Sequence, residues 1–180
     1  MRIKNTIFLC VLLLSMVGCG KTTVGTVVLV PDELMDNTTF LKAERGGLFV
    51  ESHLPSQMVV VDAEDFKEGL ESAFLASGIF AGGEKKYAIE ADIRQLEYPS
   101  FATTVNVSFL VDYDIRDEHG RLVAQKSVES EGVCSMGEHF VGGVRFRRAV
   151  DRAISNQFVL VVEFIKDEIS KDLSVITAKQ

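Results

Sequence analysis

Basic residues are scarce in this chain, and they form no run. Its 180 residues include 19 lysines and arginines against 26 aspartates and glutamates, which gives a net charge of −7 at pH 7. Binding to duplex nucleic acid depends on neutralising phosphates, so this balance argues against a nucleic-acid partner. For the same reason, we expect the acidic domain to gain nothing from the electrostatic attraction of anionic lipid headgroups.

The apolar run near the N-terminus, residues 7–14, is too short to span a bilayer comfortably. Arg2 and Lys4 precede it, and a small residue, Gly18, follows it. A positive start, a short apolar core and a small residue at the end are typical of a secretory signal and not of a transmembrane helix. The sequence therefore predicts a signal peptide over residues 1–18.

Cysteine is rare, with three in the chain: Cys10, Cys19 and Cys134. Cys10 lies inside the predicted signal peptide, and Cys19 directly follows it. Cys134 is then left without an intrachain disulfide partner in an oxidising compartment. We expect Cys134 to be a small buried hydrophobic residue; the alternatives are a free reactive thiol and an intermolecular bridge.

Motifs for catalysis and metal binding are lacking as well. His53, His119 and His139 lie far apart and form no HxH or HxxxH pair, whereas a zinc site needs three or four converging ligands. No G-x-S-x-G nucleophile elbow is present. We therefore predict no metal, no cofactor and no enzymatic activity.

Two periodicities indicate the secondary structure. Residues 62–78 carry apolar side chains at three- and four-residue spacing, with Asp62 as a capping residue and Gly78 as a stop, which predicts a helix. Residues 105–116 alternate between apolar and polar, which predicts a strand with one buried face. Residues 87–94 and 122–128 flank it as predicted neighbours, the second after a hairpin loop. This alternation favours an antiparallel sheet covered on one side.

A long helix is predicted near the C-terminus, over residues 144–170. Its apolar stripe extends from Phe146 to Ile169, and Val162 and Phe164 are among the residues that widen it beyond what one sheet face needs. This width favours deep burial against the sheet and the first helix. The alternative is an apolar strip that contacts a partner or a lipid.

The predicted order is therefore strand, helix, three-strand meander and long helix. It gives an α+β two-layer sandwich, a mainly antiparallel sheet with two helices on one face. The domain is predicted over residues 47–170. The flanking and connecting predictions are a tether at 19–46 with a strand at 24–30, a loop at 32–47, short strands at 48–50 and 58–61, a polar turn at 82–86 and a flexible tail at 171–180.

The segment Leu14-Ser-Met-Val-Gly-Cys19-Gly20 resembles a bacterial lipobox. The resemblance implies cleavage before Cys19, a diacylglycerol on its sulfur and an acyl chain such as palmitate on its new amino group. Two or more acyl chains anchor a protein stably where one holds it only marginally. By the sorting pattern of Gram-negative lipoproteins, glycine instead of aspartate at position 20 implies the outer membrane, with the domain facing the periplasm.

The chain is also similar to a group of small Gram-negative envelope lipoproteins, the YajG-like type. The similarity is carried by the lipobox at Cys19, the helix that starts at Asp62, the meander that ends near Gly132 and the last helix, entered through residues 140–149. A looser resemblance is to auxiliary lipoproteins of envelope ABC transporters, which share this order of elements. Neither resemblance implies a catalytic site.

These resemblances imply a lipoprotein held in the membrane by acyl chains on Cys19, with an envelope protein as partner. The first hypothesis is a non-catalytic interaction module. The second is an accessory subunit of a lipid or solute transport system that docks a carrier. An enzyme acting on cell-wall or lipid substrates is a third.

Three arginines form the candidate binding site. Arg145, Arg147 and Arg148 lie in the first turns of the predicted last helix, where their charge opposes the helix dipole. Internal ion pairs with Glu131 and Glu138 would compensate this charge. The alternative is an external anion, from a lipid headgroup or an acidic partner.

Four carboxylates share the polar face of the predicted sheet: Glu90, Asp92, Asp112 and Asp114. Paired carboxylates at a suitable separation can carry out acid–base chemistry. We expect an ordinary solvated sheet face instead. If this face binds something, its charge favours a basic partner.

Overall fold

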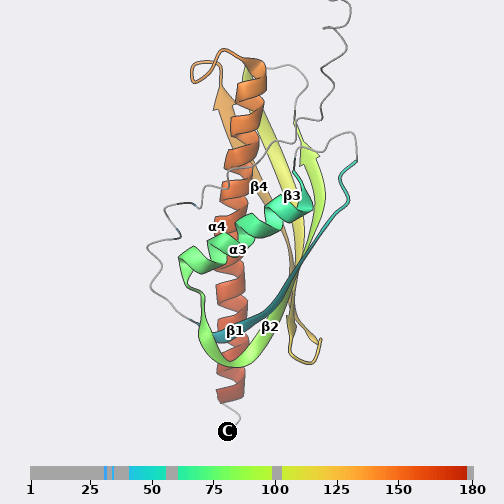
Figure 1. Ribbon diagram of the computed structural model, residues 1–180, viewed down its shortest axis with the longest axis vertical. Helices are drawn as coiled ribbons and strands as arrows, with labels where there is room; N and C mark the ends of the chain where they lie inside the picture. The colour runs from blue at the N-terminus through green and yellow to red at the C-terminus, as the bar shows by residue number, and fades with distance from the viewer. Residues whose placement is uncertain (1–30, 32–33, 35–40, 56–60, 99–102, 178–180) are drawn as a thin grey trace, which may run out of the picture.

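The computed structural model describes residues 31, 34, 41–55, 61–98 and 103–177, and every structural statement below concerns these residues. They form one mixed sheet of strand order β1-β2-β3-β4, in which β1 and β2 are parallel and the other neighbours antiparallel (Figure 1). The elements are β1 (Leu41–Ser52), α3 (Ala63–Ser77), β2 (Phe80–Glu97), β3 (Thr104–Asp117), β4 (Leu122–Ser135) and α4 (Gly142–Thr177). The predicted α+β fold is confirmed.

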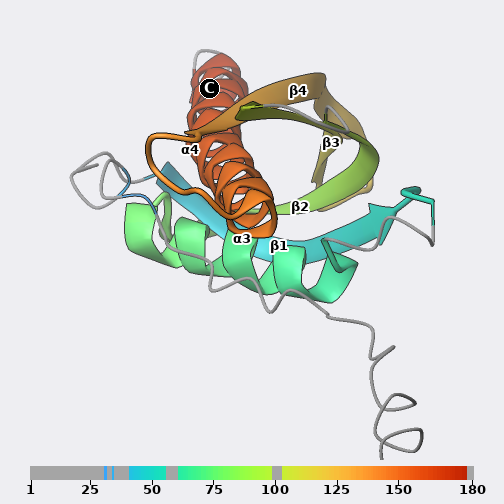
Figure 2. The same cartoon turned by 90° about the horizontal axis from the view of Figure 1, so that it is seen from above.

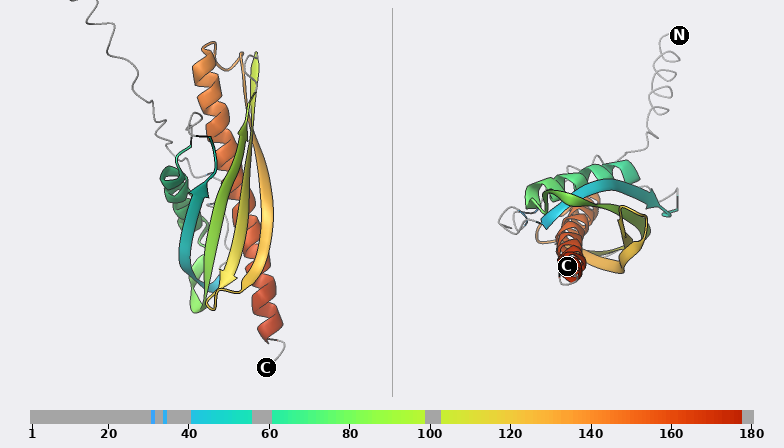
Figure 3. Two further views of the ribbon diagram at one scale, coloured as in Figure 1. Left: turned by 90° about the vertical axis from the view of Figure 1, so that its right-hand side faces the viewer. Right: turned by 90° about the horizontal axis from the view of Figure 1, so that it is seen from below.

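The two helices meet the sheet in one core. The sheet is curled, with α4 against β4 and β3 and with α3 along β1 (Figures 2 and 3). The ring of Phe66 on α3 lies 5.6 Å from that of Phe109 on β3 and 5.2 Å from that of Phe158 on α4. These three aromatic side chains are buried and join both helices to the central strand.

Helix α3 has the boundaries that the sequence predicts. The Asp62 side chain accepts a hydrogen bond from the backbone N–H of Glu64 at 2.8 Å, which satisfies one free donor of the first turn. Gly78 ends the helix in the left-handed conformation, with φ 61°. Because glycine has no Cβ, it adopts this conformation at little steric cost.

Strand β3 is one of the two inner strands of the sheet and alternates as predicted. The inward side chains are all buried: Val105, Val107, Phe109, Val111, Tyr113 and Ile115. Gln157 of α4 is buried among them and donates from Nε2 to the Tyr113 hydroxyl at 3.3 Å and to the Val128 carbonyl at 3.2 Å. This amide therefore ties α4 to both β3 and β4.

The last helix comes very close to β4. A Cβ at Gly132 would lie 1.9 Å from the carbonyl oxygen of Ala149 on α4, so only glycine fits there. Val162 and Phe164 are buried, and the wide apolar stripe of α4 is therefore mostly core. Cys134 is buried as well, as predicted.

Several boundaries differ from the prediction. Strand β1 begins at Leu41, inside the predicted loop at 32–47, and β2 includes the predicted turn at 82–86. These two segments pair with each other, Ala43 opposite Lys85, and this long-range parallel pairing leaves no local signal in the sequence. The predicted strand at 24–30 and residues 58–60 lie outside the described residues.

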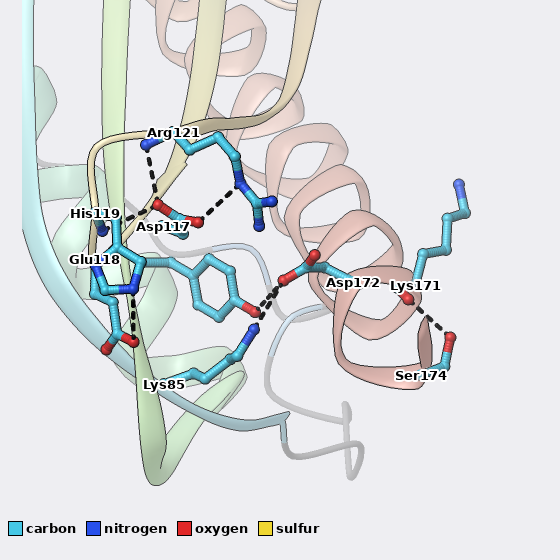
Figure 4. Close-up of polar contacts among 9 residues, drawn as sticks. Lys85, Asp117, Glu118, His119, Arg121, Lys171, Asp172 and Ser174 are labelled. Atoms are coloured by element: carbon cyan, nitrogen blue, oxygen red, sulfur yellow. Dashed lines mark hydrogen bonds and ion pairs between the residues drawn. The ribbon is translucent and has the colours of Figure 1, made fainter. Parts of the chain in front are cut away.

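Helix α4 continues to Thr177, whereas the prediction ended it at 170 and expected a flexible tail. Two contacts hold this end of the helix. The Tyr87 hydroxyl of β2 donates to Asp172 Oδ2 at 2.8 Å, and Lys85 Nζ lies 3.4 Å from the same oxygen (Figure 4). Burial and this hydrogen bond both raise the pKa of Tyr87. The phenol therefore stays protonated and remains a donor to Asp172.

Candidate functional site

The face of the sheet turned away from the helices carries a ladder of charged side chains. In the β2–β3 register Glu90 lies opposite Asp114, and Asp92 lies opposite Asp112. Like charges at opposite positions destabilise a sheet unless something compensates them. The four carboxylates predicted for this face are therefore brought together in two cross-strand pairs.

Each carboxylate pair is bridged by one arginine. Arg116 places Nε 2.9 Å from Glu90 and Nη2 3.0 Å from Asp114. Arg94 likewise lies 2.9 Å from Asp92 and 3.1 Å from Asp112. This arrangement is one of structural ion pairs, which agrees with the expected solvated face. The sequence analysis did not single out either arginine.

Further contacts complete the ladder on both sides. His53 Nδ1 lies 2.6 Å from Asp92 Oδ1, and the Ser127 hydroxyl donates to Asp112 at 2.5 Å. Phe49 of β1 is 60% exposed at the edge of this face, where it lines an open concavity with Gln125 and the charged side chains. The open face is thus mostly polar, with one exposed aromatic ring.

A second surface lies where β4 leads into α4, in the loop that projects at one end of the molecule (Figures 1 and 3). We define the apolar tip as four exposed side chains of this segment: Met136, Phe140, Val141 and Val144. Phe140 is 82% and Val141 64% exposed. Neither residue was predicted to have a role, although an apolar pair directly before the two glycines that begin α4 is a signal that the sequence offers.

The three predicted arginines lie beside the apolar tip but differ in their contacts. Arg145 Nη1 donates to the backbone carbonyls of His139 and Phe140, both at 2.8 Å, and so fixes the shape of the loop. Arg147 and Arg148 are exposed on the next turn of α4. The structure therefore places one of the three in a structural role and two at the surface.

The acidic groups near these arginines are Glu138 and Asp151. Glu138 forms an ion pair with Arg152 and not with the predicted set, and this hydrogen bond, helped by one from the Ser135 backbone, lowers the pKa of Glu138 to about 2. Asp151 is partly buried, which raises its pKa, while the charges of Arg147 and Arg148 counteract that shift. Arg152, which was not predicted to have a role, is thus the ion-pair partner of Glu138.

Metal-binding chemistry finds no support in the described residues, which contain no group of three or more histidine, cysteine or acidic side chains able to hold an ion. His119 lies near Glu118 in the β3–β4 hairpin, far from His53 on the open face. Among the described helices, none is both long and apolar enough to cross a membrane. Cys19 lies outside the described residues, and its lipidation stays a prediction.

No protein-family model matches the sequence, and no curated protein matches it. Among solved structures, the fold is similar to that of the hypothetical protein CT253 from Chlamydia trachomatis, with 10% identity, a TM-score of 0.50 and coverage of 71% of this chain and 96% of that one. At this identity the likeness shows a shared fold and nothing about function.

Two further solved structures are bacterial proteins described as lipoproteins. One, from Caulobacter crescentus, is 12% identical with a TM-score of 0.43, covering 71% of this chain and 90% of that one. The other, a minor lipoprotein from Acinetobacter baumannii, is 15% identical with a TM-score of 0.44, covering 67% and 92%. TM-scores below 0.5 do not support a conclusion about this chain. The resemblance to YajG-like lipoproteins stays a prediction.

Proposed function

We propose that this protein is a lipid-anchored, non-catalytic interaction module of the bacterial cell envelope. The observation that carries the proposal is Cys19, which ends a signal-like segment in the sequence Val-Gly-Cys-Gly. Acyl chains on Cys19 hold the chain in the outer membrane, and the folded domain faces the periplasm. Two or more chains are enough for stable anchoring.

The open face of the sheet supports a binding role over a catalytic one. Its carboxylates are held in pairs by Arg94 and Arg116, so they form a fixed pattern of charge on a rigid sheet. Phe49 supplies an exposed aromatic contact beside that pattern. A polar face of this kind suits an envelope protein partner whose charges complement the ladder.

The second candidate is an accessory lipoprotein of an envelope transport system. The α4 stripe that prompted this hypothesis is mostly buried, so it offers little docking surface. The observation that favours it is the apolar tip, which could contact a carrier or a membrane component.

Lipidation is tested by expressing the full chain in a Gram-negative host fed a clickable palmitate analogue. We expect label on the native chain, none on Cys19→Ala, and undiminished label on Cys134→Ala, a matched cysteine control because Cys134 is buried. Separation of inner and outer membranes then locates the labelled chain. Label that persists in Cys19→Ala would refute the anchor.

The interaction role is tested by crosslinking in intact cells. We expect one abundant envelope partner that is recovered with the native chain and lost with Cys19→Ala, because the anchor concentrates the domain at its membrane. Recovery of inner-membrane transporter subunits instead would favour the second candidate. A native chain that yields no specific partner would contradict the interaction module.

A further inference from the structure

We propose that the apolar tip is a membrane-contacting element that inserts Phe140 and Val141 into the surface of an anionic bilayer, with Arg147 and Arg148 at the level of the lipid headgroups. This inference goes beyond the proposed function, because the contact needs neither an acyl chain on Cys19 nor a protein partner. It assigns a ligand class, anionic phospholipid, to the end of the molecule where β4 leads into α4.

Exposed apolar side chains are concentrated at the end of the molecule where β4 leads into α4. Among the described residues, ten large hydrophobic side chains are exposed, and six of them belong to this region. They are the four residues of the apolar tip together with Val133 and Tyr98, whose ring lies 4.6 Å from that of Phe146 at the start of α4. Scattered exposed hydrophobic residues are normal, whereas their concentration at one end of the molecule favours a contact surface there.

Arg147 and Arg148 lie at a suitable distance from the apolar residues of the tip. Arg147 and Arg148 follow the first helical residue, Gly142, by five and six positions. At about 1.5 Å of rise per residue, their backbones lie roughly 8–9 Å along the helix from its start. Apolar faces of interfacial elements are buried about 5–10 Å into the boundary between headgroups and acyl chains. With α4 aligned along the bilayer normal, the guanidinium groups therefore reach the headgroups when Phe140 and Val141 reach the acyl boundary.

The start of α4 is positively charged although the chain as a whole is acidic. The chain as a whole is acidic, with a net charge of −7, yet the first turns of α4 combine Arg145, Arg147 and Arg148 with no acidic residue in the first turn. The acidic residue that faces the two exposed arginines on their own helix is Asp151, which is partly buried. Exposed arginines beside apolar side chains complement an anionic lipid surface.

The loop between β4 and α4 is held in a fixed conformation before it meets a membrane. Arg145 donates to the carbonyls of His139 and Phe140, and the Ser135 and Glu138 contacts close the preceding turn. A fixed loop loses little conformational freedom on insertion. It also projects outward from the end of the molecule, a convex shape that fits the surface of a fluid bilayer (Figure 3).

The test uses tryptophan fluorescence, because the chain has no tryptophan of its own. The full chain carrying Phe140→Trp is mixed with vesicles of phosphatidylethanolamine and phosphatidylglycerol in a three-to-one molar ratio. We expect a blue-shifted emission that acyl-brominated lipid quenches. The matched control is Phe49→Trp, which places the probe at an exposed aromatic position on the open face and should show neither change.

Two further arms test the charges. Vesicles of phosphatidylcholine alone should give a much weaker shift. Adding Arg147→Gln and Arg148→Gln to the Phe140→Trp chain should weaken binding to the anionic vesicles by about 25-fold, since each basic residue near the surface contributes roughly a fivefold gain. Circular dichroism of each variant shows that the fold is retained, because these side chains are exposed.

The outcomes separate this inference from the proposed function. A probe at position 140 that stays in water with both kinds of vesicle overturns the membrane contact, and a protein partner then becomes the occupant of the tip. An equal response in anionic and neutral vesicles overturns the role of the arginines. If the native chain takes up no palmitate label at Cys19 in the labelling experiment but inserts its tip here, this inference is supported while the proposed anchor is refuted.

Discussion

Single residues decide what the open face of the sheet can do. Without Arg94 and Arg116, this face would carry two pairs of opposed carboxylates, and repulsion between them would weaken the β2–β3 pairing. Each arginine spans one pair through different nitrogens, which the planar fork of a guanidinium allows and a lysine does not. The ladder is therefore a fixed charge pattern that depends on two residues.

Glu138 makes stability depend on pH in the acid range. Its pKa is lowered to about 2 in the folded chain by Arg152, so its ion pair stabilises the fold above the ordinary carboxyl pKa and is lost as the pH falls toward 2. We expect Glu138→Gln to be less stable than the native chain at pH 6, with the difference shrinking between about pH 4.5 and 2. Urea denaturation across that pH range measures this difference.

The control for Glu138→Gln is Glu84→Gln, which removes one negative charge from an exposed position at the start of β2. It separates the loss of the Arg152 contact from the change in net charge. A stability difference for Glu138→Gln that stays constant down to pH 2 would contradict the assigned ion pair.

At the scale of elements, the sequence predicts what is local and periodic. Helix α3 and strand β3 were predicted because Asp62, Gly78 and the alternation of residues 105–116 act within a few residues of the backbone they shape. The parallel pairing of β1 with β2 was not predicted, because residues 41–47 owe their strand conformation to pairing with β2, about forty residues further along the chain. Long-range pairing of this kind leaves no period to detect.

The candidate sites follow the same division. The carboxylates at 90, 92, 112 and 114 were placed on one face by alternation alone, but their bridging by Arg94 and Arg116 depends on the β2–β3 register. The arginines at 145, 147 and 148 were placed at the start of a helix by its period. Their separate roles depend on a loop fold, in which Arg145 turns back onto the Phe140 carbonyl.

The contact between α4 and β4 depends on one glycine. A methyl group at position 132 would overlap the backbone of α4, 1.9 Å from the Ala149 oxygen and 2.4 Å from the Ala153 nitrogen, and backbone atoms cannot move aside as a side chain can. We expect Gly132→Ala to lower the free energy of unfolding by about 3 kcal/mol, at the upper end of ordinary overpacking. Thermal and urea denaturation measure the change.

Gly143→Ala is the matched control, because a Cβ at that position meets nothing within 4 Å and the residue lies in the first turn of the same helix. We expect it to be neutral or slightly stabilising, since alanine favours helix over glycine. Equal effects of the two substitutions would mean that α4 does not approach β4 as closely as described.

The whole molecule separates its surfaces by chemistry. Two helices cover one face of the sheet, the other face carries the charged ladder, and the exposed apolar residues gather at the end where α4 begins. The far end of helix α4 is held by the hydrogen bond from the Tyr87 hydroxyl to Asp172. One body thus presents a polar face and an apolar end in a fixed relation.

We expect the two helices and the sheet to unfold together. Phe66 is where they meet, since its ring contacts Phe109 of β3 and Phe158 of α4 and is buried. We expect Phe66→Ala to lower the free energy of unfolding by about 3–5 kcal/mol. Phe49 is an exposed phenylalanine on β1, and we expect Phe49→Ala to lower the free energy of unfolding far less. Denaturation followed by circular dichroism measures both.

Hydrogen exchange on the Phe66→Ala chain then shows whether the core is one cooperative unit. If it is, amides of α3, β3 and α4 lose protection by the same amount, because all three depend on the same global opening. Loss confined to α3, with β3 and α4 still protected as in the native chain, would show that α3 opens on its own. In that case the ladder and the tip would keep their relation without it, and the rigid unit would consist of the meander and α4.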